Sequence, residues 1–160
     1  MESTGMRVAV GQQNLGSPGT DPLGWRRYMA FAGVVIYLFG QAYDTYWHAR
    51  NVSFIVEPPS SLWTIHLGIW VGAVVTMAAG ATQLRISGFR VAGGLLVVGG
   101  GVELAGYFLD MWKHSQGTSL DFYHDLVWYG FGVVVIAMVR LEAMRRNRLG
   151  AARHVDRTGP

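Results

Sequence analysis

The sequence of 160 residues contains no cysteine, which excludes disulfides, thiolate metal sites, iron–sulfur clusters and cysteine nucleophiles. Charge is also scarce, because only 14% of the residues are charged while 51% are hydrophobic. The mean hydropathy of +0.25 is typical of a membrane protein. Nucleotide-binding, nucleic-acid-binding and hydrolase motifs are also missing. We therefore expect an integral membrane protein whose partner is the lipid bilayer and not a nucleic acid.

Four stretches of about 20 residues or more are apolar enough to cross a bilayer as helices. They are residues 27–48, 62–84, 89–113 and 119–139. Short connections within each consecutive pair predict two antiparallel helical hairpins. The predicted fold is all-α, an integral membrane four-helix bundle in residues 25–142. A flexible arm (1–24) precedes it and a basic tail (143–160) follows it.

The basic residues predict the orientation of these spans. Of the 13 Lys and Arg residues, only Arg50 and Lys113 lie at one end, and the others lie in the arm, the middle loop and the tail. Cytoplasmic loops of membrane proteins carry an excess of such residues. We expect a multi-pass protein of the cell (inner) membrane with both termini in the cytoplasm.

A polar pattern occurs twice at the opposite, extracytoplasmic end of the spans. Each copy has an Asp, a His four residues later and a second His at the start of the next span. The copies are Asp44, His48 and His66, and Asp110, His114 and His124. The Asp and the first His are displaced by 66 residues between the copies, and the second His by 58. We interpret this as an internal repeat, residues 27–84 and 89–140, with a pseudo-twofold axis along the membrane normal.

The repeated residues are suited to metal binding. Asp44 and His48 share one helix face, and the hairpin returns His66 to the same depth. One carboxylate and two imidazoles bind copper, zinc or non-haem iron and leave coordination positions open. Structural hydrogen bonding near the interface and a proton relay are the alternatives. The sequence leaves open whether the two sets form one dinuclear site or two mononuclear sites.

Two further acidic residues are candidates for orienting the metal ligands without binding the metal themselves. Glu103 lies one heptad before Asp110, so it either supports a ligand or carries protons. A helix-paired or snorkelling Glu is the alternative. Asp121, three residues before His124, either orients that ligand or caps its helix.

The pattern of an Asp-x-x-x-His on one span and a His at the start of the next resembles the copper site of the C subunit of particulate methane and ammonia monooxygenases. The resemblance covers roughly residues 37–72 and 103–130. It implies copper in both sets and, in a complete complex, oxygen activation and hydroxylation of a small substrate. The family has Asn in one set where this sequence has Asp in both, and its C subunit has more spans.

The predicted function is therefore that of a membrane metal-binding protein, with copper as the first choice, that oxidises a small substrate with oxygen. Three alternatives remain open: a non-catalytic copper-handling protein, a membrane cytochrome with His pairs on haem, and a proton-coupled transporter or assembly subunit. Other membrane subunits or further copies of the chain are the expected protein partners.

Overall fold

The structure, a computed structural model, describes residues 21–51, 59–118 and 120–157, and every regular element among them is an α-helix. The elements are α1 (Trp25–Asn51), α2 (Pro59–Ile65), α3 (Leu67–Gln83), α4 (Arg90–Ser115) and α5 (Asp121–Arg157). The predicted all-α class is confirmed for this part of the chain. Most of the predicted N-terminal arm and of the connection before Pro59 lies outside the described residues.

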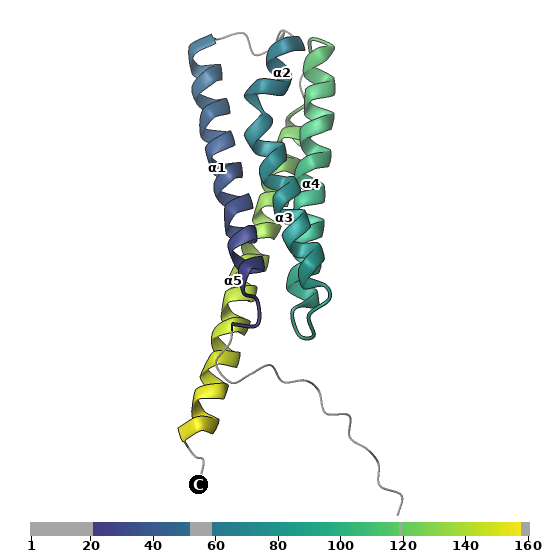
Figure 1. Cartoon of the computed structure of the whole chain (residues 1–160). Helices are drawn as coiled ribbons and strands as arrows, with labels where there is room; N and C mark the ends of the chain where they lie inside the picture. The colour runs from purple at the N-terminus through teal and green to yellow at the C-terminus, as the bar shows by residue number, and fades with distance from the viewer. Residues whose placement is uncertain (1–20, 52–58, 119, 158–160) are drawn as a thin grey trace, which may run out of the picture.

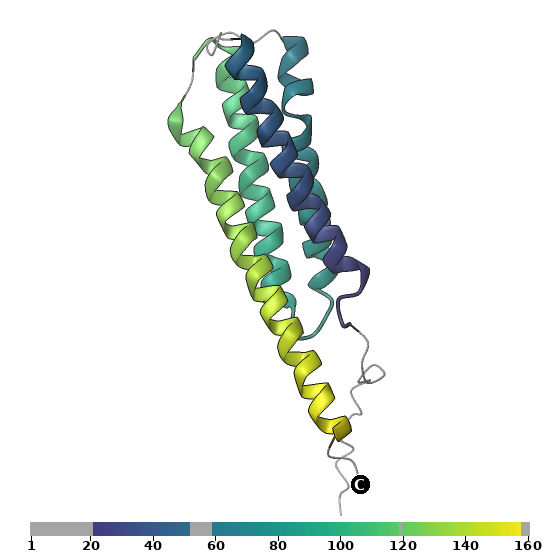
Figure 2. The same cartoon turned by 90° about the vertical axis from the view of Figure 1, so that its left-hand side faces the viewer.

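The long helices run side by side with alternating direction (Figures 1 and 2). Helix α1 packs on α3, α3 on α4, and α4 on α5. The ends of α1 and α4 and the starts of α2 and α5 therefore meet at one end of the molecule. Helix α5 continues past the other helices at the opposite end (Figure 1).

Two helices are long and apolar enough to span a membrane: α4, and residues Asp121–Ala151 of α5. Helix α3 is apolar but has only 17 residues. Helix α1 is long enough but is not one of the two, since Gln41 and Asp44 lie in its second half. The amino-acid composition of the helices thus agrees with a membrane protein most clearly in the second half of the chain.

The predicted span over residues 62–84 is interrupted. Helix α2 ends at Ile65, α3 begins at Leu67, and His66 between them has φ −92° and ψ 2°. This is the sparsely populated bridge region, in which many active-site residues lie. The carbonyl of His66 accepts the N–H of Ile69 at 2.9 Å, so a new helix starts here. His66 therefore lies at the junction between α2 and α3.

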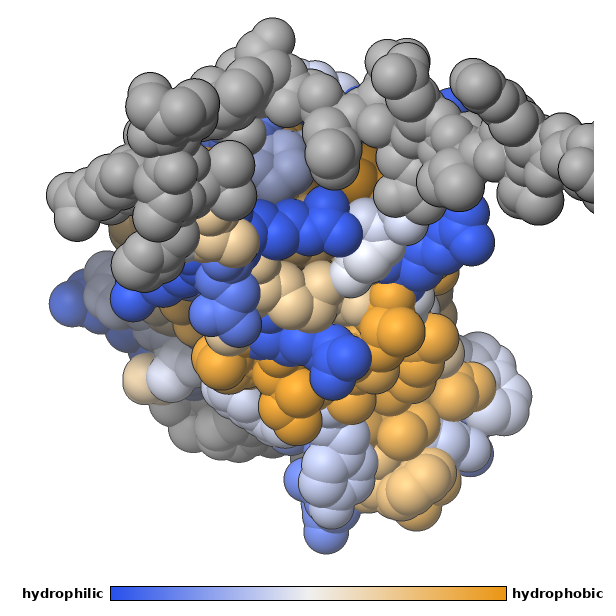
Figure 3. Space-filling view, turned by 90° about the horizontal axis from the view of Figure 1, so that it is seen from below, coloured by the Kyte–Doolittle hydropathy of each residue, from blue (hydrophilic) through white to orange (hydrophobic). Residues whose placement is uncertain are grey.

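Helix α5 is longer than the predicted span over residues 119–139, and it continues through most of the predicted tail. Glu142 accepts hydrogen bonds from Arg145 at 2.7 Å and Arg146 at 2.9 Å, which are the i+3 and i+4 pairs that stabilise a helix surface. Arg148 donates to the carbonyl of Ser87 at 2.8 Å and thereby ties α5 to the loop before α4. Hydrophilic residues gather at this end beside hydrophobic ones (Figure 3).

Glycines bring α1 and α3 into backbone contact. A Cβ on Gly72 would lie 2.5 Å from the nitrogen of Tyr37 and 2.7 Å from the carbonyl oxygen of Gly33. A Cβ on Gly40 would lie 2.5 Å from the carbonyl carbon of Gly68. Small residues of this kind are typical of helix crossings inside membranes.

Helices α4 and α5 meet in the same way. A Cβ on Gly130 would lie 2.5 Å from the nitrogen of Glu103 and 2.6 Å from the carbonyl oxygen of Gly99. A Cβ on Gly106 would lie 2.9 Å from the nitrogen of Val127. Each residue of α4 here is 66 positions after its counterpart in α1, and Gly130 is 58 positions after Gly72. The two helix pairs therefore share their closest contacts as well as their ligand pattern.

Replacing Gly72 with Ala tests this crossing. The added methyl group meets backbone atoms that have no room to move, so we expect the free energy of unfolding to fall by about 1–3 kcal/mol. The matched control is Gly101→Ala in α4, where a Cβ meets nothing within 4 Å. That control should gain about 0.5–1 kcal/mol, because Ala favours a helix over Gly. Denaturant unfolding of the detergent-purified protein, followed by circular dichroism, measures both. Equal stability of the two variants would contradict the described crossing.

Candidate metal centre

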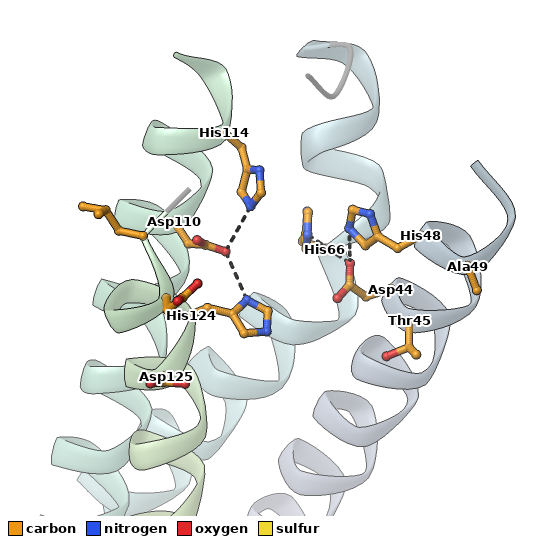
Figure 4. Close-up of a pocket in the computed structure, with 11 residues that line it drawn as sticks. Asp44, Thr45, His48, Ala49, His66, Asp110, His114, His124 and Asp125 are labelled. Atoms are coloured by element: carbon orange, nitrogen blue, oxygen red, sulfur yellow. Dashed lines mark hydrogen bonds and ion pairs between the residues drawn. The ribbon is translucent and has the colours of Figure 1, made fainter. Parts of the chain in front are cut away.

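A cavity of about 600 Å³ lies at the end of the molecule where α1 and α4 finish. All six predicted ligands line it, and Figure 4 shows the two sets on opposite sides of it. The remaining lining residues are Thr45, Ala49, Leu120, Asp121 and Asp125. The fold thus brings both sets into one chamber, which the sequence had left open.

The first set converges on a single carboxylate oxygen. Oδ1 of Asp44 lies 3.1 Å from Nε2 of His48 and 3.0 Å from Nε2 of His66. Asp44 and His66 are each only 8% exposed. One ligand atom from each of the three side chains lies within 4.8 Å of the other two. Helix spacing places Asp44 beside His48, and the break before α3 brings in His66.

A backbone contact orients the ring of His66. Its Nδ1 lies 2.8 Å from the carbonyl oxygen of Leu62, and a carbonyl only accepts, so Nδ1 carries the proton of the neutral ring. Nε2 then turns its lone pair toward Asp44. A histidine that binds a metal through one nitrogen usually donates the other N–H to a carbonyl or carboxylate in this way. The Tyr107 hydroxyl reaches the same Leu62 carbonyl at 3.3 Å and its ring lies 5.2 Å from that of His66.

The facing atoms of the first set need a positive charge between them. A lone pair of His66 and a carboxylate oxygen of Asp44 repel each other at 3.0 Å unless a proton or a metal ion lies between them. Ligands bonded to a tetrahedral ion at about 2.0–2.1 Å are separated from one another by roughly 3.3 Å. The separations of Asp44 Oδ1 from the two imidazole nitrogens, 3.0 and 3.1 Å, are close to this value and equally suit protonated histidines.

The second set is looser and more open. Oδ2 of Asp110 lies 3.6 Å from Nε2 of His114 and 3.4 Å from Nδ1 of His124. The His124 side chain is 59% exposed, against 11% for His66. His124 lies in the first turn of an unbroken helix, whereas a carbonyl holds His66 at a helix break. The two sets repeat in sequence, but the second is more exposed to solvent than the first.

The two acids predicted to support the ligands lie in different places. Asp121 lines the cavity from the first turn of α5, where it also suits the helix dipole. Glu103 does not line the cavity; it is 2% exposed and lies in α4 beneath it. Sequence reasoning did not select Asp125, a lining residue next to His124. It also missed Tyr107, and the only signal for it was its position one turn before Asp110.

The cavity lining is rich in side chains that can bind cations. Its described lining includes four carboxylates and four imidazoles and no Lys or Arg. A concave surface of one charge sign raises the local concentration of oppositely charged ions. The donor set and the lack of Lys and Arg in the described lining therefore suit a metal cation.

Comparisons with protein-family models, with curated proteins and with solved structures gave no match to the chain. The resemblance of the ligand pattern to a monooxygenase subunit stays a prediction. Function therefore rests on the chemistry of the cavity.

The unequal closure of the two sets predicts unequal reactivity. In metal-free protein, we expect diethyl pyrocarbonate to modify His124 several-fold faster than His66, because the reagent needs access to an imidazole nitrogen. Mass spectrometry of the proteolysed protein at successive times measures both rates. The solvent-side control is a short peptide containing a single histidine. Equal rates for His124 and His66 would contradict the described burial.

Proposed function

We propose that the protein binds metal ions in this cavity, at Asp44, His48 and His66 and at Asp110, His114 and His124. The observation that carries the proposal is the Nε2 of His66, which faces a carboxylate oxygen 3.0 Å away while Nδ1 is held by a carbonyl. The arrangement leaves the ring with one nitrogen pointed at the place where a cation would lie.

Copper is the proposed metal. Imidazole ligands suit copper, zinc and iron, and at a given nitrogen and oxygen site divalent copper binds most tightly of the first-row metals. The resemblance of both sets to the copper site of the monooxygenase C subunit supports the same choice. Zinc and non-haem iron are the alternatives that a competition experiment separates.

The proposed architecture is a four-helix bundle that crosses the cell membrane four times, built from two hairpin repeats. What supports the repeats is that the glycine contacts of α1 with α3 recur between α4 and α5 at the same sequence shifts as the ligands. What supports the membrane is the apolar length of α4 and α5 and the many exposed hydrophobic side chains. Arginines at the end opposite the cavity favour cytoplasmic termini and a cavity on the extracytoplasmic side.

The proposed activity is oxidation of a small molecule by oxygen. Copper bound in the cavity would supply the one-electron and oxygen chemistry. The chain's own part is to hold metal with the three residues of each set, to keep the first set away from bulk water and to leave the cavity open beside His124. Asp121 and Asp125 at this opening are the polar groups available to orient a substrate.

Non-catalytic copper handling is the second candidate. The exposure of His124, at 59% of its side chain, favours it, because an exchangeable ion needs a ligand that solvent and carriers can reach. Oxygen consumption by the copper-loaded protein separates the two: a turnover with reductant supports oxidation, and its absence with retained copper supports handling.

Metal analysis of the detergent-purified protein tests the proposal. We expect about one or two equivalents of copper per chain, and more copper than zinc after exposure to an equimolar mixture. Asp44→Asn should weaken copper binding at least about 10–100-fold. That loss is already typical when the mutated residue only hydrogen-bonds to a metal ligand. Asp110→Asn should remove the more weakly bound equivalent of copper, the one held by the looser second set.

The matched control for these variants is Asp125→Asn. It removes a carboxylate from the same cavity wall but from neither His-containing set, so stoichiometry should be retained. Failure of the wild type to retain any metal after reconstitution would overturn the proposal. An equal loss in all three variants would assign the effect to overall charge and not to ligation.

Membrane topology is testable because the chain has no native cysteine. Gln116→Cys, next to the cavity end, should react with a membrane-impermeant maleimide added outside spheroplasts. Ser87→Cys, in the exposed loop between α3 and α4, should react only after lysis. The reverse pattern would invert the proposed orientation, and labelling of both before lysis would contradict integration.

A further inference from the structure

Beneath the two ligand sets, the structure contains a second layer of buried polar groups, formed by Tyr37 and Glu103. Each lies seven residues before the Asp of its set, and they occupy equivalent positions in α1 and α4. Seven residues are two turns, about 10 Å along the helix. Tyr37 is 1% exposed and Glu103 is 2% exposed. The pair therefore lies inside the bundle at one level.

Both residues pack against neighbouring positions of α5. The ring of Tyr37 stacks on Phe131, with centroids 4.6 Å apart and planes 11° apart. Gly130 lies against Glu103, so that a Cβ there would be 2.8 Å from Cγ of Glu103. Tyr37 and Glu103 therefore occupy the same layer of the core, two helix turns below the Asp of each set.

Neither residue has its hydrogen bonding satisfied. The Tyr37 hydroxyl and Oε1 of Glu103 are buried and have no hydrogen-bond partner among the described residues. Tyr107, one turn above Glu103, differs because its hydroxyl contacts Met111 at 2.6 Å and Leu62 at 3.3 Å. The aromatic neighbours of this layer, Phe131 of α5 and Trp70 of α3, carry no charge. On α1, the titratable residue at this level is Tyr37.

Packing alone does not account for a carboxyl group here. A buried polar group without a partner destabilises a fold, and an ionised one does so far more. An apolar residue of similar volume would fill the same space without that cost. The position of Glu103 below a cavity built for cations gives it a different use.

We propose that Glu103 is the proton store of the metal cavity: it holds a proton while the cavity lacks a cation and releases it when a metal ion binds to Asp44, His48 and His66. This inference rests on the proposed metal site. A divalent ion beside one Asp leaves a net positive charge in a low-dielectric interior, where it favours a second negative charge nearby. The O–H bond of the Glu103 carboxyl breaks, the proton leaves through the cavity to water, and no electron moves. The Tyr37 hydroxyl then donates a hydrogen bond to the carboxylate.

Proton counting during metal binding tests the proposal. Calorimetric titration of the intact, detergent-purified protein with divalent copper, in two buffers of different ionisation enthalpy, gives the protons released per ion. Glu103→Gln should bind the ion with wild-type stoichiometry but release about one proton fewer, since the histidine ligands contribute equally in both proteins. Tyr37→Phe keeps the ring stack and should release a smaller fraction of that proton. The control, Gln83→Met, removes a buried amide at the end of α3 away from the cavity and should match the wild type.

Infrared difference spectra of the wild type keep the proposal testable if Glu103→Gln does not fold. Addition of redox-silent zinc should remove the band of a protonated carboxyl group. Where Glu103→Gln does fold, its spectrum should lack this change. Metal binding by the wild type with no loss of that band, or with equal proton release by Glu103→Gln, would overturn the proton store alone. No metal binding by the wild type would overturn the metal site and with it the proton store.

Discussion

Backbone contact through glycine is the constraint on which the rest of the structure depends. Gly40 lies one turn before Asp44, and Gly68, against which it packs, lies two residues after His66. Side chains at a normal helix separation would hold these two elements farther apart, and an Asp and a His on them would be too distant to share an ion. The close crossing therefore fixes both the helix pair and the distance between Asp44 and His66, and Gly106 has the same role in the second pair.

The two Asp-His-His sets share one sequence pattern, but a helix break occurs in only the first of them. Both begin with an Asp and a His four residues apart on an unbroken helix. In the first set the helix is interrupted at His66. The Leu62 carbonyl contacts Nδ1 of His66, and Nε2 of the same ring lies 3.0 Å from Asp44. In the second set α5 is continuous from Asp121, and His124 remains exposed. The result is a cavity with a closed side that suits a resident ion and an open side that suits exchange with what enters.

The interior below the cavity is not simply apolar. Tyr37, Trp70 and Glu103 each place a polar atom without a hydrogen-bond partner, among the described residues, in the layer under the ligands. Such groups lower stability, so their concentration next to a cavity lined by carboxylates and imidazoles connects the packing of the core to the chemistry of the site. At this level the positions seven residues before each Asp differ, with Tyr in α1 and Glu in α4, so that only the α4 side of the core carries a carboxyl group.

The sequence by itself determined the helical class and the pairing of each Asp with the His four residues later, because both follow from the local period of a helix. It also picked out six of the residues that line the cavity, since polar side chains at matching positions stand out in apolar spans. Only the tertiary structure decided that α2 and α3 separate at His66, that α5 continues to Arg157, and that both sets share one cavity. These features depend on contacts between distant segments, such as Arg148 with Ser87 and Gly40 with Gly68, which local periodicity does not encode.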